Sequence, residues 1–207
     1  MIRILHISDT HAEQHTVPTI EQIALKQVRC DVIALTGDVT SSFNTKLRKE
    51  WNNWPHKYKF LVPGNHGDTK ETYENSTNWK RNTPWIESVE DMLFIGLDSI
   101  KKHHTFDFPE NSFDNKRING VVTLIHRPEK IKLESWIKSI STRIRNDTKY
   151  LLLHGHTHDN EWEETYVAGF SVKRSNVHSR ESYGTAALIT WNGLEFSHKE
   201  VRGSENS

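Results

Sequence analysis

Short hydrophobic runs alternate with polar or amphipathic stretches along most of this chain. Apolar runs bounded by turn residues are typical of strands that are buried on both faces of a sheet. The first run begins at Ile2, and the third stops at the turn signal Pro63-Gly64. The predicted strands are Ile2–Ile7, Asp31–Thr36, Lys59–Val62, Met92–Leu97, Val121–Ile125 and Tyr150–Leu153.

Three segments between these runs have apolar residues at helical spacing, and we expect amphipathic helices over Thr19–Arg29, Asn44–Trp54 and Glu134–Arg145. Two other segments, Gly67–Thr83 and Lys101–Gly120, are rich in polar residues. We expect the first to form a loop or irregular helix and the second an extended surface loop. Long loops of this kind are often functional.

The last part of the chain has a different pattern, with three predicted strands and no helix between them. These strands are Tyr166–Val172, Ala186–Trp191 and Leu194–Glu200. The last two are joined by Asn192-Gly193, the preferred dipeptide of a two-residue hairpin turn. Strands that alternate with helices indicate an α/β fold, and the length fits one domain. We expect this domain to span residues 1–201 and a polar tail to follow over 202–207.

Composition and charge exclude several classes of function. Lys and Arg together number 27, as do Asp and Glu, so no basic surface for nucleic acid is indicated. No apolar stretch reaches the roughly 20 residues that span a bilayer. The first strand leaves no room for a signal peptide, and the single Cys30 fits a reducing compartment, so we expect a cytoplasmic protein. The sequence does not indicate an oligomeric state.

Candidate metal ligands follow five of the predicted strands directly. In open α/β sheets the ligand site lies at the carboxyl ends of the strands, so residues far apart in the sequence can meet there. In the Asp-x-His motif, alternation along a strand would place Asp9 and His11 on the same side, and His156 and His158 have the same spacing. The five motifs are Asp9-Thr10-His11, Gly37-Asp38, Gly64-Asn65-His66, His126 and Gly155-His156-Thr157-His158.

The donor set fits two metal ions. Two aspartates, four histidines and one asparagine make seven groups, or four bonds per metal if Asp38 bridges both. Imidazole and carboxylate donors without thiolate favour Mn, Fe, Zn, Co or Ni over Ca. Two such ions can lower the pKa of a bound water to about 7 and clamp the oxygens of an in-line displacement at phosphorus. A bridging hydroxide would still leave a positive centre that attracts a phosphate.

These motifs, in this order, resemble the calcineurin-like metallophosphoesterase family over essentially the whole chain. The resemblance implies a four-layer α/β/β/α sandwich, two divalent or mixed-valence ions of Mn, Fe or Zn, and a small phosphoester substrate. It implies one metal site from Asp9, His11, Asp38 and His158, and a second from Asp38, Asn65, His126 and His156. His66 would not bind metal but would assist the leaving group as the catalytic residue.

Two segments narrow the expected substrate. Phe94–Ser99 and Leu124–Pro128 are similar to the class III cyclic nucleotide phosphodiesterase-like branch, which implies a nucleotide-like or cyclic phosphodiester. A phosphomonoesterase, acting on nucleotides or phosphoproteins, and a noncatalytic scaffold with the same fold are the alternatives. Of the seven tryptophans, Trp79 and Trp85 are the candidates for stacking on a nucleobase.

Three positions depart from the family pattern. Gly67 replaces the acidic residue that usually follows Asn-His, and Asp68 is then a candidate to orient His66. Ser41 stands where a second acidic residue often follows the Gly-Asp motif. Arg127 follows His126 where the diesterase-like branch often has another histidine, and an arginine there could bind a substrate phosphate through two hydrogen bonds.

Overall fold

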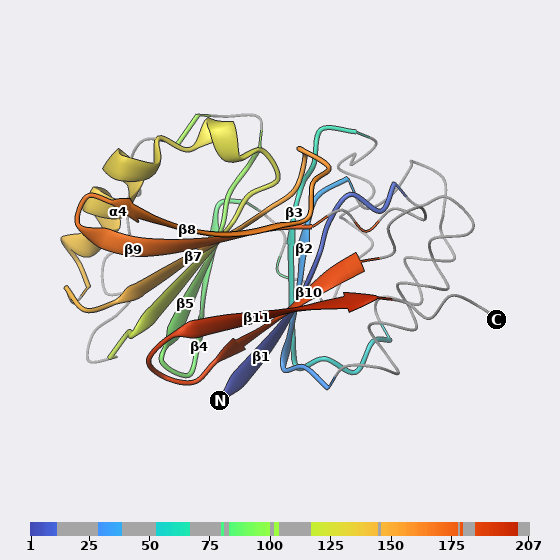
Figure 1. Ribbon diagram of the computed structural model, residues 1–207, viewed down its shortest axis with the longest axis horizontal. Helices are drawn as coiled ribbons and strands as arrows, with labels where there is room; N and C mark the ends of the chain where they lie inside the picture. The colour runs from blue at the N-terminus through green and yellow to red at the C-terminus, as the bar shows by residue number, and fades with distance from the viewer. Residues whose placement is uncertain are drawn as a thin grey trace.

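Two β-sheets packed face to face form the body of the protein (Figure 1). The structure is a computed structural model. It describes residues 1–11, 29–38, 53–66, 80, 83–99, 102–103, 117–144, 146–177, 179 and 185–202. None of the helices in these ranges has the length and apolar character that a transmembrane span requires.

The first sheet has the strand order β11-β10-β1-β2-β3. β1 lies at its centre, parallel to β2 and antiparallel to β10, and β3 continues the parallel part beyond β2. All the side chains of β2 are buried, as its unbroken apolar run predicts. The strands are β1 (Ile2–Ile7), β2 (Val32–Thr36), β3 (Tyr58–Val62), β10 (Thr185–Trp191) and β11 (Phe196–Arg202).

The second sheet has the order β4-β5-β6-β7-β9-β8. Its four middle strands are parallel, and the edge strands β4 and β8 are antiparallel to their neighbours. A 3-10 helix, η2 (Pro128–Lys130), and the helix α4 (Leu133–Ser141) connect β6 to β7. The strands are β4 (Trp85–Val89), β5 (Met92–Gly96), β6 (Gly120–Leu124), β7 (Lys149–His154), β8 (Glu161–Val167) and β9 (Phe170–Asn176).

Two hydrophobic cores are formed among the residues that the structure describes. One lies between the sheets, where Ile4 of β1 and Phe94 of β5 belong to the same buried cluster. The other lies on the opposite face of the second sheet, which α4 covers (Figure 1), and it includes Trp136 and Ile140 of that helix. A helix layer and two sheet layers are therefore seen, and the predicted α/β fold class is confirmed. The segments 12–28 and 44–52, which hold most of the two other predicted helices, lie outside the described residues.

The six strands predicted from the apolar runs are confirmed to within one residue at each end, but three other predictions were wrong. Residues 166–172 do not form one strand, because the chain reverses at Ala168-Gly169 between β8 and β9. The helix after β6 ends at Ser141 rather than at Arg145. The β10–β11 hairpin has a four-residue connection, since Trp191 pairs with Phe196 and the Asn192 side chain accepts the amides of the last two loop residues.

One strand was missed, and it changes the interpretation of Trp85. β4 carries Trp85 into the core between the sheets, where its ring lies 5.0 Å from that of Phe60 and its indole N–H donates to the Leu61 carbonyl. Trp85 is buried, so it cannot stack on a nucleobase. Trp79 lies outside the described residues.

The β8–β9 turn generates a stability prediction. Ala168 and Gly169 both have positive φ, at 54° and 86°, as a two-residue type I′ turn requires. Alanine is strained there, whereas asparagine tolerates this conformation. We expect Ala168→Asn to stabilise the protein by up to about 1 kcal/mol, or about 2–4 °C in Tm measured by calorimetry. A lower Tm would contradict the assigned turn.

Candidate metal centre

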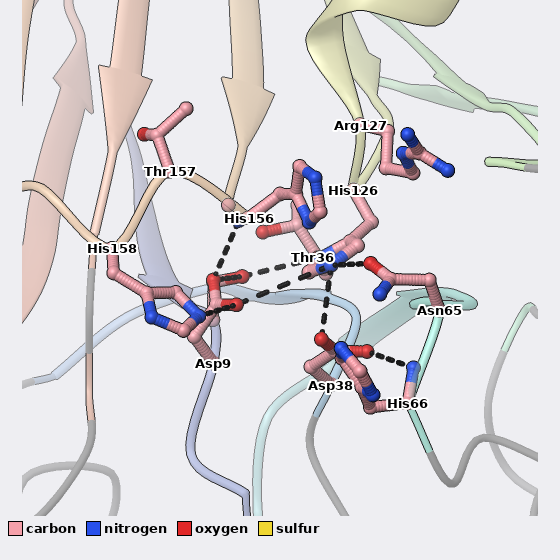
Figure 2. Close-up of polar contacts among 12 residues, drawn as sticks. Asp9, Thr36, Asp38, Asn65, His66, His126, Arg127, His156, Thr157 and His158 are labelled. Atoms are coloured by element: carbon pink, nitrogen blue, oxygen red, sulfur yellow. Dashed lines mark hydrogen bonds and ion pairs between the residues drawn. The ribbon is translucent and has the colours of Figure 1, made fainter.

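The candidate ligands meet at one end of the two sheets, on the loops that follow five parallel strands (Figure 2). Asp9 and His11 follow β1, Asp38 follows β2 and Asn65 follows β3. The loops after β6 and β7 in the second sheet supply the rest. Parallel strands end on the same edge of a sheet, so the strand pattern itself brings these side chains together. The loop residues of the second sheet are His126, His156 and His158.

Asp9 lies at the centre of this group. Its Oδ2 accepts hydrogen bonds from Ser8 Oγ at 2.7 Å and from the amide of His156 at 2.9 Å. Its Oδ1 is buried and accepts no hydrogen bond among the described residues, although His158 Nε2 lies 3.3 Å away. Such an atom is costly unless a cation or donor satisfies it. The unsatisfied Oδ1 therefore fits a metal ligand.

His126 connects the two aspartates from the other sheet. Its ring is fully buried, and its Nδ1 donates to the Thr36 carbonyl at 2.7 Å. Its Nε2 lies 3.2 Å from Asp38 Oδ2 and 2.9 Å from Asn65 Oδ1. A hydrogen bond from the other ring nitrogen to a carbonyl is the usual way in which proteins orient a metal-binding histidine. The surroundings of His126 therefore fit a ligand that binds through Nε2.

The charges at this site are coupled. Burial alone would lower the pKa of His126, but the hydrogen bond to Asp38 and the charges of Asp9 and Asp38 raise it above its ordinary value. Burial would raise the pKa of Asp38, but the bonds from His126 and from the His66 amide bring it below the ordinary value. The two carboxylates thus need positive charge nearby, which a proton on His126 supplies without metal and divalent ions would supply instead.

The donors form two groups whose atoms lie within 4.8 Å of one another. One group is Asp9, His11 and His158, and the other is Asp9, Asp38 and His126. Both groups share Asp9, whereas the family resemblance makes Asp38 the shared ligand. The ring of His156 lies 5.2 Å from that of His126, beside the second group. The pKa of His156 is lowered, first by burial and then by His126, which favours the neutral form that a ligand needs.

Backbone strain is concentrated at this site. Five candidate ligands have positive φ, from 48° at Asp38 to 74° at His156. Asp9 and His11 therefore approach each other through left-handed turns beyond the end of β1, and the strand alternation assumed from the sequence is not the reason. Left-handed residues other than glycine cost about 1–3 kcal/mol each and cluster at functional sites. The five residues are Asp9, His11, Asp38, His156 and His158.

Two glycines allow the close approach of these loops. A Cβ atom on Gly155 would lie 2.0 Å from Ser8 Oγ and 2.1 Å from Asp9 Oδ2. A Cβ atom on Gly64 would lie 2.0 Å from Asp38 Oδ1. Both contacts are far shorter than van der Waals distance, so any larger residue would displace a carboxylate.

The remaining predicted residues lie at the rim. His66 is exposed, its amide donates to Asp38 Oδ1 at 2.7 Å, and its ring lies 6.2 Å from that of His11. Arg127 is half-buried, and its Nε donates to Glu129 Oε1 at 2.6 Å (Figure 2 shows its position). Asp68, which we expected to orient His66, lies outside the described residues together with Gly67 and Ser41.

Sequence reasoning missed three residues that support the ligands. Ser8 binds Asp9, the Thr36 carbonyl binds His126, and Ser99 Oγ accepts the His126 amide at 3.0 Å while donating to the Pro63 carbonyl. Ser8 and Ser99 lie beside recognised motif residues, which was an available signal. Nothing in the sequence distinguishes a backbone carbonyl such as that of Thr36.

Comparison with known proteins was informative at the level of family and fold. A family model described as calcineurin-like phosphoesterase matches residues 2–189. An archaeal phosphodiesterase is similar in structure, with a TM-score of 0.54 and 13% identity over 97% of this chain and 100% of its own. A Staphylococcus aureus protein assigned as a 5′-nucleotidase gives a TM-score of 0.52 and 12% identity over 100% of this chain and 55% of its own. No curated protein matches the sequence.

The crowded position of Gly155 gives a direct test of the site geometry. We expect Gly155→Ala to push Asp9 out of place and to weaken Mn²⁺ binding by tenfold or more in isothermal titration, because the new methyl group occupies the position of its carboxylate. Gly169→Ala is the control, since its φ of 86° is also positive but nothing lies within 4 Å of the added Cβ. Equal Mn²⁺ affinity in both variants would show that Asp9 is not held as described.

Proposed function

Because the chain belongs to the calcineurin-like phosphoesterase family, whose members are metal-dependent phosphoester hydrolases, we propose that its strand-end site cleaves a small phosphodiester. The observation that carries this proposal is the convergence of two buried aspartates with three histidines, beside which a fourth, His156, lies. We further propose that the catalytic domain spans residues 1–201.

The proposed cofactors are two divalent ions, with Mn, Fe and Zn as the candidates. When bound, they activate a water for in-line attack and neutralise charge on the phosphoryl group. Two observations support this proposal. Asp9 Oδ1 is buried without a hydrogen bond from any described residue, so a cation would satisfy it. The Nε2 of buried His126 faces Asp38 and Asn65, where it could bind the same kind of ion. The proposed ligand sets are Asp9, His11, Asp38 and His158 for one ion, and Asp38, Asn65, His126 and His156 for the other.

The ligand loops would hold the reacting groups in a fixed geometry. The Ser8 hydroxyl and the His156 amide fix one oxygen of Asp9, which leaves the other free to bind. The Thr36 carbonyl keeps the proton of His126 on Nδ1. Preorganisation of this kind lowers the cost of binding a charged substrate, because the dipoles need not reorient during the reaction.

His66 is the proposed acid for the leaving oxygen. Its side chain is exposed, so it is accessible to a bound substrate, and its backbone amide ties its loop to Asp38. A protonated imidazole within hydrogen-bond reach of a leaving oxygen can act as a general acid. The Arg127 guanidinium donates to Glu129 through Nε, so a role in phosphate binding would fall to its two terminal nitrogens.

A diester is preferred to a monoester on the similarity of Phe94–Ser99 and Leu124–Pro128 to the diesterase-like branch. The archaeal phosphodiesterase of similar fold is consistent with this choice. A phosphomonoesterase is the second candidate, because the similar Staphylococcus aureus protein is assigned as a 5′-nucleotidase.

The substrate class is tested by comparing bis(p-nitrophenyl) phosphate with p-nitrophenyl phosphate on protein stripped of metal and reloaded with Mn²⁺. We expect a higher kcat/KM for the diester. A higher value for the monoester would establish the phosphatase alternative. Turnover of neither ester with Mn²⁺, Fe²⁺ or Zn²⁺ would support the noncatalytic scaffold and contradict the proposal.

The roles of His66 and Asp38 can be separated by two variants. We expect His66→Ala to lower kcat about 100-fold or more while two Mn²⁺ ions remain bound, because a general acid contributes to turnover and not to metal affinity. Asp38→Asn should reduce Mn²⁺ binding and turnover together, because it removes ligand charge. Metal content by mass spectrometry and kcat are measured on the same samples. Full activity in His66→Ala would exclude its catalytic role.

A further inference from the structure

A buried histidine outside the predicted ligand set lies directly behind the site. His6 of β1 is completely buried between the two sheets. Its Nε2 lies 2.8 Å from Thr36 Oγ1 of β2, and its Nδ1 lies 3.0 Å from Ser175 Oγ of β9 in the second sheet. Burial holds the pKa of His6 well below its ordinary value, so the ring is neutral and has one donor and one acceptor. Each ring nitrogen therefore has a hydroxyl partner.

Thr36 connects this histidine to the metal centre. It is the last residue of β2, immediately before Gly37-Asp38. Its side chain bonds to His6, and its carbonyl accepts the Nδ1 proton of His126 at 2.7 Å. The Ser8 Oγ, whose proton is shared with Asp9, lies 3.1 Å from the same carbonyl oxygen. One residue thus links the interior histidine to His126 and, through Ser8, to Asp9.

We propose that His6 is a positioning residue for His126 and acts through Thr36. The hydrogen bond to Thr36 Oγ1 fixes the rotation of the last peptide of β2, and that rotation aims the carbonyl at His126 Nδ1. With the proton held on Nδ1, Nε2 faces Asp38 and Asn65. The metal role of His126 rests on the proposed function, whereas the orientation of its ring does not.

The hydrogen bonds of His6 with Thr36 and Ser175 explain why a polar residue occupies this position in the core. A hydrophobic side chain at position 6 would leave the hydroxyls of Thr36 and Ser175 without their partner in a region where both are fully buried. Removal of a group that supports a metal ligand typically lowers metal affinity 10–100-fold. If His6 only filled space in the core, its replacement would change the stability of the protein but not the orientation of the His126 ring.

The test uses a matched pair at Thr36, with His6→Leu as the second disruption. Thr36→Val removes only the hydroxyl and keeps the shape, whereas Thr36→Ser keeps the hydroxyl. Ile4→Val is the packing control, because Ile4 is buried on the same strand and belongs to the hydrophobic core between the sheets. Two readouts are measured for each protein. They are the imidazole ¹⁵N–¹H spectrum of His126 without metal, and Mn²⁺ affinity by isothermal titration.

We expect wild type, Thr36→Ser and Ile4→Val to show His126 protonated at Nδ1 and to bind Mn²⁺ with affinities within about threefold of one another. Thr36→Val and His6→Leu should each lose the ordered Nδ1 proton and weaken Mn²⁺ binding about tenfold. The double variant, His6→Leu with Thr36→Val, should bind Mn²⁺ no more weakly than either single variant, because both changes break the same hydrogen bond.

Two results would overturn the proposal. One is a Thr36→Val protein with an unchanged His126 spectrum and unchanged Mn²⁺ affinity, which would make the bond between His6 and Thr36 a packing feature. The other is additive losses in the double variant, which would mean that His6 acts independently of Thr36. Failure of the proposed function would look different. The wild-type protein would then bind no Mn²⁺, while the metal-free spectra would still decide how the His126 ring is oriented.

Discussion

The burial of two aspartates at the ends of neighbouring parallel strands is the constraint on which this site depends. Asp9 is completely buried and Asp38 nearly so. Buried carboxylates are tolerated only when hydrogen bonds and positive charge compensate them, and here amides, a serine hydroxyl and His126 surround them. One oxygen of Asp9 remains unsatisfied. We therefore interpret the site as built around cations, with the protein supplying two fixed, buried carboxylates.

The placement of these side chains is accompanied by strain in the backbone. The backbone is left-handed at five residues of the ligand loops: Asp9, His11, Asp38, His156 and His158. Gly64 and Gly155 allow neighbouring loops to contact the carboxylates. Such strain persists only where the surroundings determine the geometry. The two packed sheets supply that rigidity, and the proposed link from His6 through Thr36 would extend it from the core to His126. The rigidity of the site therefore depends on the packing of the sheets, because the ligand loops begin at the ends of the packed strands.

Much of this fold could be predicted because buried parallel strands are nearly continuous apolar runs, and the six strands that end at or beside the site were located to within one residue. β4 was missed because its polar Glu87-Ser88 interrupts the pattern, and the β8–β9 turn was missed because Ala168 is not a typical turn residue. The ligand candidates were found from side-chain chemistry. The carbonyl of Thr36 and the left-handed turns could not be found, because backbone geometry leaves no mark on residue type.

We propose that residues from five separate strand ends form one dinuclear centre. The most direct measurement is electron paramagnetic resonance of the metal-free protein titrated with Mn²⁺. We expect binding to saturate at two ions per chain and the second ion to produce the spectrum of a spin-coupled pair. Saturation with a single uncoupled ion, or with two ions that show no coupling, would contradict a shared centre at these strand ends.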